Sequence, residues 1–139
     1  MIAYVDSSVI LRLVLNEPKP LQEWPEVHHG VTSALAEVEV LRTLDRLRFL
    51  APTIDVHALA GRREAAFRIL EGFETVEITR VVLARAAQPL ATPLGTLDAI
   101  HLVSAMGWRE QFENLMFATH DEALATAARS SGFEVLGAR

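Results

Sequence analysis

Met1-Ile-Ala-Tyr-Val-Asp6-Ser-Ser-Val9 stands at the start of the chain, and an apolar run follows it as far as Leu15. Apolar residues before an aspartate, then two serines, predict a short buried strand, a turn and a helix, because Asp and Ser are favoured at helix N-termini. In an open α/β sheet, ligands bind beyond the carboxyl ends of the strands. Asp6 therefore either faces a binding site or caps the first helix, and this stretch alone does not decide between the two.

Composition indicates one soluble domain over residues 1–139, long enough to bury a core. The absence of cysteine excludes disulfides, thiolate zinc sites and cysteine nucleophiles. No apolar run approaches the roughly 20 residues of a membrane span. The start of the chain has no basic segment or long apolar stretch typical of a signal peptide. These features predict a cytoplasmic protein that does not contact a membrane.

The charges are unevenly distributed. The net charge is -5, yet 12 of the 13 basic residues are arginine, and six of these lie between positions 42 and 68, where there are three acids. Arginine clusters suit phosphate contacts because the guanidinium group is planar and bidentate. From charge alone, however, solvated helix faces are the better explanation.

Hydrophobic periodicity predicts that strands and helices alternate along the chain. Strands are expected before Asp6, at 73–79, before Asp121 and at 133–136, and residues 30–33 are expected to form a turn that leads into a brief strand or a cap. Helices are expected after Asp6 and over 21–27, 34–50, 56–72, 81–90, 97–105 and 122–131, with a turn at 51–55 and Thr96 as an N-cap. Such alternation indicates parallel strands joined by right-handed crossovers, that is, an α/β fold with a central parallel sheet between helical layers.

Four carboxylates are placed where they can converge. Asp6 and Asp121 follow predicted strands, Asp98 lies in the first turn of a helix, and Glu39 lies near the start of another. Such a cluster is electrostatically costly unless a cation fills it, and oxygen ligands select hard ions such as Mg²⁺ or Mn²⁺. A metal held in this way beside arginines can activate water and stabilise the leaving oxygen of a phosphodiester. The pattern therefore suggests metal-dependent hydrolysis of a nucleic-acid backbone.

Helical geometry separates the two glutamates of the 34–50 segment. At 100° per residue, Glu37 points about 160° away from Glu39, which shares its stripe with Arg42 and Arg46. Glu39 is thus the better candidate for a site beside phosphate-binding arginines. The alternative is a surface Glu–Arg pair worth a few tenths of a kcal/mol.

Histidines and Asp98 have ordinary structural explanations as well. An aspartate in a first turn is favoured by the helix dipole, and a histidine in an apolar helix, such as His101, is usually packed and hydrogen-bonded. His28 and His29 are adjacent, with no further histidine nearby, and are interpreted as surface residues rather than metal ligands.

Four fragments in order resemble the PIN-domain nucleases and, within them, the VapC toxins of toxin–antitoxin pairs. They are Tyr4-Val-Asp-Ser-Ser8, Ser33-Ala-Leu-Ala-Glu-Val-Glu-Val-Leu-Arg42, Leu97-Asp-Ala-Ile-His-Leu102 and Ala118-Thr-His-Asp-Glu122.

The resemblance covers almost the whole chain, and what it implies is specific. It implies a three-layer α/β/α PIN-like domain in which the family's acidic metal-binding set is matched by Asp6, Glu39, Asp98 and Asp121. The family's second acid stands three residues before an arginine, which again selects Glu39. Thr119 matches a hydroxyl residue near the site, and Ser7 is a further candidate of this kind. Family membership implies a divalent-metal endoribonuclease, a homodimer and an inhibitory antitoxin.

Other classes fit less well. Aspartyl-phosphate enzymes and receiver domains need a late lysine, and the single lysine is Lys19; such phosphatases also need an acid where Ser8 stands. A dinucleotide-binding domain is excluded because no Gly-x-Gly-x-x-Gly follows the first strand. The remaining alternative is a PIN-like module that binds RNA or protein without catalysis.

Overall fold

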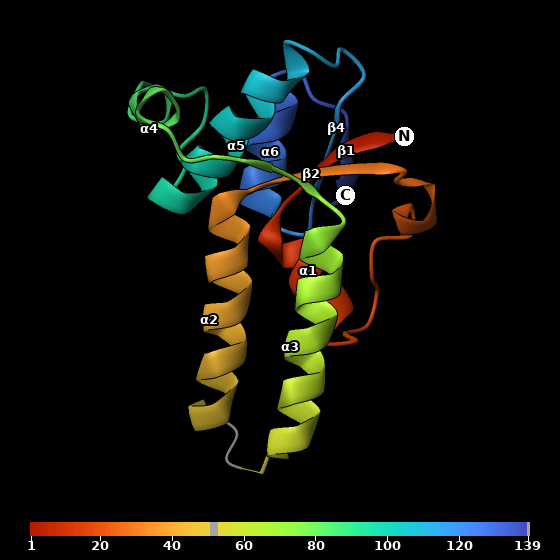
Figure 1. Cartoon of the computed structure of the whole chain (residues 1–139). Helices are drawn as coiled ribbons and strands as arrows, with labels where there is room; N and C mark the ends of the chain where they lie inside the picture. Colours follow the sequence, from red (N-terminus) through yellow and green to blue (C-terminus); the bar gives the residue numbers. More distant parts are fainter. Residues whose placement is uncertain (51–52, 139) are drawn as a thin grey trace.

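The computed structural model describes residues 1–50 and 53–138 as a five-stranded parallel sheet with helices on both faces (Figure 1). The strands are β1 (Ile2–Val5), β2 (His29–Ser33), β3 (Glu74–Val76), β4 (Met116–Thr119) and β5 (Val135–Gly137). Their order in the sheet is β3-β2-β1-β4-β5, and every neighbouring pair is parallel. The predicted α/β fold with a central parallel sheet is confirmed, and β1 occupies the centre of the sheet.

Helices cover both faces of this sheet. They are α1 (Ser7–Val14), α2 (Ala34–Leu50), α3 (Val56–Glu71), α4 (Arg80–Ala86), α5 (Thr96–Arg109) and α6 (Glu122–Ser130). Helices α1, α2 and α3 pack against one another, whereas α4 and α6 both contact α5. The result is a three-layer α/β/α domain.

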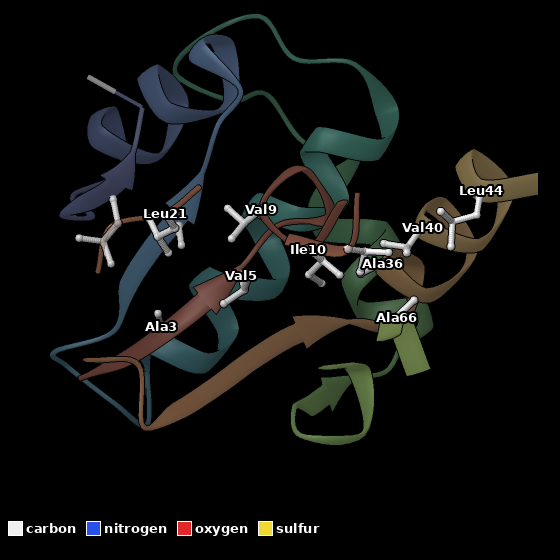
Figure 2. Close-up of a cluster of buried hydrophobic side chains, with 12 residues drawn as sticks. Ala3, Val5, Val9, Ile10, Leu21, Ala36, Val40, Leu44 and Ala66 are labelled. Atoms are coloured by element: carbon white, nitrogen blue, oxygen red, sulfur yellow. The ribbon is translucent and has the colours of Figure 1, made fainter. Parts of the chain in front are cut away.

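Alternation along β1 divides its side chains between two cores. Ala3 and Val5 point to one face, where they meet buried residues of α1, α2 and α3, among them Ile10, Val40 and Ala66 (Figure 2). Because successive side chains of a strand point to opposite faces, the residue between them serves the other layer. The first strand therefore anchors both halves of the molecule.

The second core lies under α5 and α6. Tyr4 stacks on Phe117 of β4 with ring centroids 5.3 Å apart, and both side chains are fully buried. Leu102 of α5 and Leu124 of α6 belong to the same cluster. The central strands β1 and β4 thus contribute apolar side chains to both cores, as expected for a parallel sheet covered on both sides.

Helices α2 and α3 form a long hairpin that extends beyond the edge of the sheet (Figure 1). Asp55 caps α3 by accepting a hydrogen bond from the backbone N–H of His57, and Arg62 donates to the carbonyl of Val14, tying α3 to α1. Near the far end of the hairpin, Phe49 is 68% exposed. Residues 51 and 52 of the turn predicted at 51–55 lie outside the described part of the chain.

The structure corrects several predicted elements. The helix predicted over 21–27 is only a 3₁₀ turn, η1 (Trp24–Glu26), because Pro25 interrupts the segment. The helix predicted over 81–90 ends at Ala86, and the N-cap of α5 is Gly95 rather than Thr96. His29 is not a simple surface residue, since it lies in β2 and contacts Glu74 at 2.9 Å.

Among the described residues, no helix combines the length and apolar character needed to cross a membrane.

Candidate active site

Asp6 lies at the carboxyl end of the central strand, and its carboxylate is only 5% exposed. Although Asp6 occupies the N-cap position of α1, its side chain makes no capping hydrogen bond. It accepts hydrogen bonds instead from the hydroxyl groups of Ser7 (3.2 Å), Ser8 (2.6 Å) and Thr119 (2.7 Å). Three hydroxyl donors around one buried carboxylate are more than helix capping requires, which favours the binding-site interpretation.

The corner between β4 and α6 encloses this carboxylate from the other side. The backbone N–H of Asp6 donates to the carbonyl of Ala118, and the N–H of His120 donates to Ser8 Oγ at 3.0 Å. The N–H of Asp121 donates to Thr119 Oγ1, while Asp121 Oδ1 accepts from the N–H of Leu124 and so caps α6. The first two of these contacts join residues 112 positions apart, and the other two shape the corner locally.

Glu39 reaches the same region through a buried histidine. His101 on α5 has no exposed surface; its Nε2 lies 2.5 Å from Glu39 Oε1 and 3.7 Å from Asp6 Oδ1. Its Nδ1 lies 2.7 Å from the phenolic oxygen of Tyr4. Burial lowers the pKa of His101, but the hydrogen bond to Glu39 and the neighbouring carboxylate charges outweigh it, so this pKa lies above its ordinary value.

Asp98 completes the group. Its pKa is raised first by burial and then by the negative charges of Asp121, Asp6 and Glu39, with His101 opposing them. A carboxyl group that responds to three others lies within their electrostatic range. The structure thus brings the four predicted carboxylates, which come from β1, α2, α5 and the β4–α6 corner, to one end of the sheet.

The predicted arginines are placed differently. Arg42 forms an ion pair with Asp45 at 2.7 Å, and Asp45 also contacts Arg48 at 3.1 Å, so this part of α2 carries a surface charge network. Arg46 is exposed. No contact between these arginines and the carboxylates is seen among the described residues, so their part in substrate binding stays a prediction.

Glu37 lies apart from Glu39, as the helical geometry indicated. It lines a separate hollow of about 260 Å³ between α2 and α3, together with Phe67 and Leu70. Glu39 is the glutamate that shares contacts with His101.

Two residues beside the carboxylates were not predicted as part of the site. His101 was predicted to be packed and hydrogen-bonded, which is correct, but its contact with Glu39 was not foreseen; the available signal was its position three residues after Asp98. Ser8 links Asp6 to the β4–α6 corner, and only its place directly after Ser7 hinted at this.

The donor set suits a hard divalent cation, because the converging side chains are carboxylates and hydroxyls. Burial raises the pKa of Asp98 most and repulsion from the neighbouring carboxylates adds to it, and such an ion would relieve this repulsion. Within residues 1–50 and 53–138, however, no three acidic or histidine side chains are yet arranged closely enough to enclose an ion. Asp6 is held by hydroxyls and Glu39 by His101.

The fold and this site define a parallel α/β domain with an acidic centre at the carboxyl end of its middle strands. The family model for the PIN domain matches residues 3–130. The chain therefore belongs to the PIN-domain family.

Two curated relatives are similar over nearly their whole length, and both are from Mycobacterium tuberculosis. Ribonuclease VapC47 is 28% identical over 137 residues, covering 94% of this chain and 92% of the relative. Ribonuclease VapC46 is 33% identical over 136 residues, covering 96% and 95%. The crystal structure of PAE2754 from Pyrobaculum aerophilum has the same fold, with a TM-score of 0.65 and 18% identity over 97% of this chain and 83% of that one.

Proposed function

We propose that this protein is an endoribonuclease of the VapC type, the toxin of a toxin–antitoxin pair, which hydrolyses RNA phosphodiester bonds with the help of a divalent cation. The observation that carries the proposal is the placement of Asp6, Glu39, Asp98 and Asp121 at one end of the sheet, where Asp6 and Glu39 both lie beside His101. The similarity to two proteins named as ribonucleases supports the same class of reaction.

Asp6 is the most rigidly held of these groups. Its Oδ2 accepts hydrogen bonds from Ser8 and Thr119, and its Oδ1 accepts one from Ser7. These three hydrogen bonds fix the orientation of the carboxylate. Preorganised acceptors of this kind avoid a reorganisation cost during reaction. Thr119 and Ser7 act chiefly by orienting Asp6, and their direct contact with substrate is a prediction from the resemblance.

Glu39 is positioned by His101, which Tyr4 holds in turn. Tyr4 and His101 are buried, and Glu39 is partly buried, so the hydrogen bond with His101 restricts the orientation of the glutamate side chain. Asp98 and Asp121 contribute from the more open side, where an RNA backbone can approach.

Mg²⁺ or Mn²⁺ would be held by Asp6, Glu39, Asp98 and Asp121. A bound cation of this kind would lower the pKa of a water molecule and neutralise charge that develops on the phosphate. The proposed partners are an RNA substrate, an inhibitory antitoxin protein and a second copy of the chain, in the cytoplasm.

The test is cleavage of total RNA by the purified, antitoxin-free protein with Mg²⁺, Mn²⁺ or EDTA. Discrete fragments are expected with metal and not with EDTA. Asp6→Asn should abolish cleavage, because it removes the charge of one of the four carboxylates that would hold the cation. Asp45→Asn, which removes a surface carboxylate, is the matched control and should cleave like the original protein.

Full activity of Asp6→Asn would overturn the assignment of that carboxylate. If RNA binds without metal and is not cleaved under any condition, the protein is a binding module rather than an enzyme.

A further inference from the structure

A cavity of about 750 Å³ lies next to the β4–α6 corner, and His120 forms part of its wall. Its lining includes Arg12 of α1, Lys19 and Trp24 of the α1–β2 connection, and Gly137 of β5. A volume between roughly 300 and 1,000 Å³ is typical of small-molecule sites. The cavity is therefore large enough for a nucleotide.

One residue of the cavity wall, His120, also contacts the candidate active site. Arg12 lies four residues after Ser8 on α1, one turn along the same helix face. His120, which lines the cavity, donates its backbone N–H to Ser8 Oγ, and Ser8 in turn donates to Asp6. Because His120 lies between Thr119 and Asp121, the cavity and the carboxylates share the β4–α6 corner.

The cavity wall carries more positive than negative charge, although the whole chain has a net charge of -5. Arg12 and Lys19 line it, against one acid, Glu23. Lys19 is the only lysine of the chain, and it has a left-handed backbone with φ of 57°. The guanidinium of Arg12 donates to the Lys19 carbonyl at 3.2 Å, which holds this backbone in place, and its Nε lies 3.8 Å from Glu17.

Two rings complete the wall. Trp24 is half-buried and is oriented by an edge contact with Phe73, with ring centroids 6.0 Å apart. His120 has a buried Nε2 for which the described residues supply no hydrogen-bond partner. An aromatic ring offers a stacking surface to any base, and a ribose 2′-hydroxyl can either donate to or accept from a ring nitrogen.

We propose that this cavity binds one nucleotide of single-stranded RNA next to the cleaved bond. Trp24 stacks on the base, Arg12 and Lys19 contact the phosphate, and His120 Nε2 hydrogen-bonds with the 2′-hydroxyl group. The inference rests on the proposed function for its substrate class, but it concerns a part of the surface that the carboxylates do not reach.

Binding is tested by the fluorescence of Trp24. Trp108→Phe leaves Trp24 as the only tryptophan, and Asp6→Asn prevents cleavage during the titration. Adding a 12-nucleotide single-stranded RNA of mixed sequence should quench this fluorescence, and the DNA of the same sequence should bind several-fold more weakly. Quenching by an antitoxin protein and not by RNA would overturn the proposal and identify the cavity as a protein-binding surface.

The contribution of charge is tested with Lys19→Asn. Asparagine removes the charge and accepts a left-handed backbone readily, so the variant should fold normally. Its RNA affinity should fall several-fold, and the slope of log K against log salt should decrease by about 0.7, the value for one phosphate contact on a single strand. Arg80→Gln, which removes an exposed positive charge from the start of α4, is the control and should change neither quantity as much.

The two proposals fail in distinguishable ways. If the original protein cleaves RNA and both Lys19→Asn and Trp24→Phe do so with unchanged KM and kcat, the subsite is wrong and the nuclease stands. If no RNA is cleaved but RNA still quenches Trp24 in a Lys19-dependent manner, the subsite stands without the nuclease. RNA binding with no quenching overturns the subsite.

Discussion

Asp98 is a residue whose charge works against folding. Its raised pKa means that the folded protein binds this proton more tightly than the unfolded chain does. The resulting penalty is absent below the ordinary pKa of 3.8 and is complete once the pH exceeds the raised value. Removing the charge should therefore stabilise the protein near neutral pH.

Asp98→Asn should raise the free energy of unfolding in EDTA, measured by urea denaturation, while abolishing RNA cleavage. The control is Asp45→Asn. Burial raises the pKa of Asp45, but the hydrogen bond from Arg42 and the charges of Arg42 and Arg48 outweigh it and lower this pKa, so the control should gain no stability. A destabilised Asp98→Asn would contradict the raised pKa of Asp98 in the folded protein.

His101 gives the same protein a pH dependence of known sign. Its folded pKa lies above 6.5, so the stability it contributes is fully present below about pH 6.5 and is lost as the pH rises through the folded value. In EDTA, urea denaturation should show lower stability at about pH 8 than at about pH 6. A flat profile over this range would contradict the close contact of the imidazole with Glu39 and Asp6.

The sequence pattern predicted the carboxylates of the site but not the hydrogen bonds that hold them. Asp6, Asp98 and Asp121 could be placed from the sequence because strand ends and first helical turns are local features. The contact between His101 and Glu39 could not, because it depends on how two helices 62 residues apart pack across the end of the sheet. Ser8 was missed for the same reason, since its partners lie in the β4–α6 corner.

The predicted ends of helices and strands were most accurate where the hydrophobic periodicity extended over many residues. Helix α2 begins and ends at the predicted residues, because its 17 residues contain several full turns of pattern. The helix predicted over 21–27 was wrong because the segment is short and contains Pro25. Short strands were located to within a few residues, but their order in the sheet needed the structure.

The end of β5 packs closely against Thr119, and this contact requires a glycine at position 137. Gly137 has φ of 93°, and an added Cβ would lie 2.6 Å from the carbonyl oxygen of Thr119. Gly137→Ala should therefore destabilise the protein by about 1–3 kcal/mol and lower cleavage by displacing Thr119. The measurement is urea denaturation together with the cleavage assay.

Gly61→Ala is the matched control for that substitution. Gly61 lies inside α3 with nothing within 4 Å of an added Cβ, so alanine there should stabilise the protein by about 0.5–1 kcal/mol. Equal effects at the two positions would show that Thr119 does not restrict Gly137.

For the molecule as a whole, charge is separated between an acidic centre and an arginine-bearing hairpin. Arg42 and Arg46 lie on α2, the same helix that supplies Glu39. If they contact RNA, Arg42→Ala and Arg46→Ala should each weaken binding and reduce the slope of log K against log salt by about 0.7. Arg68→Ala, at an exposed ion pair with Glu64, is the control. An unchanged slope would leave Arg42 as a surface partner of Asp45.

The end of β1 is synthesised long before the residues of the β4–α6 corner that contact it. Asp6 is synthesised before its partner Thr119, which follows 113 positions later. At roughly 5–20 residues per second, this separation corresponds to a delay on the order of ten seconds. A chain whose synthesis has not reached Thr119 thus carries Asp6 without one of its three hydroxyl partners, so the hydrogen bonds around this carboxylate are complete only after that point. A cell that makes such an enzyme is exposed to the finished protein and not to the nascent one.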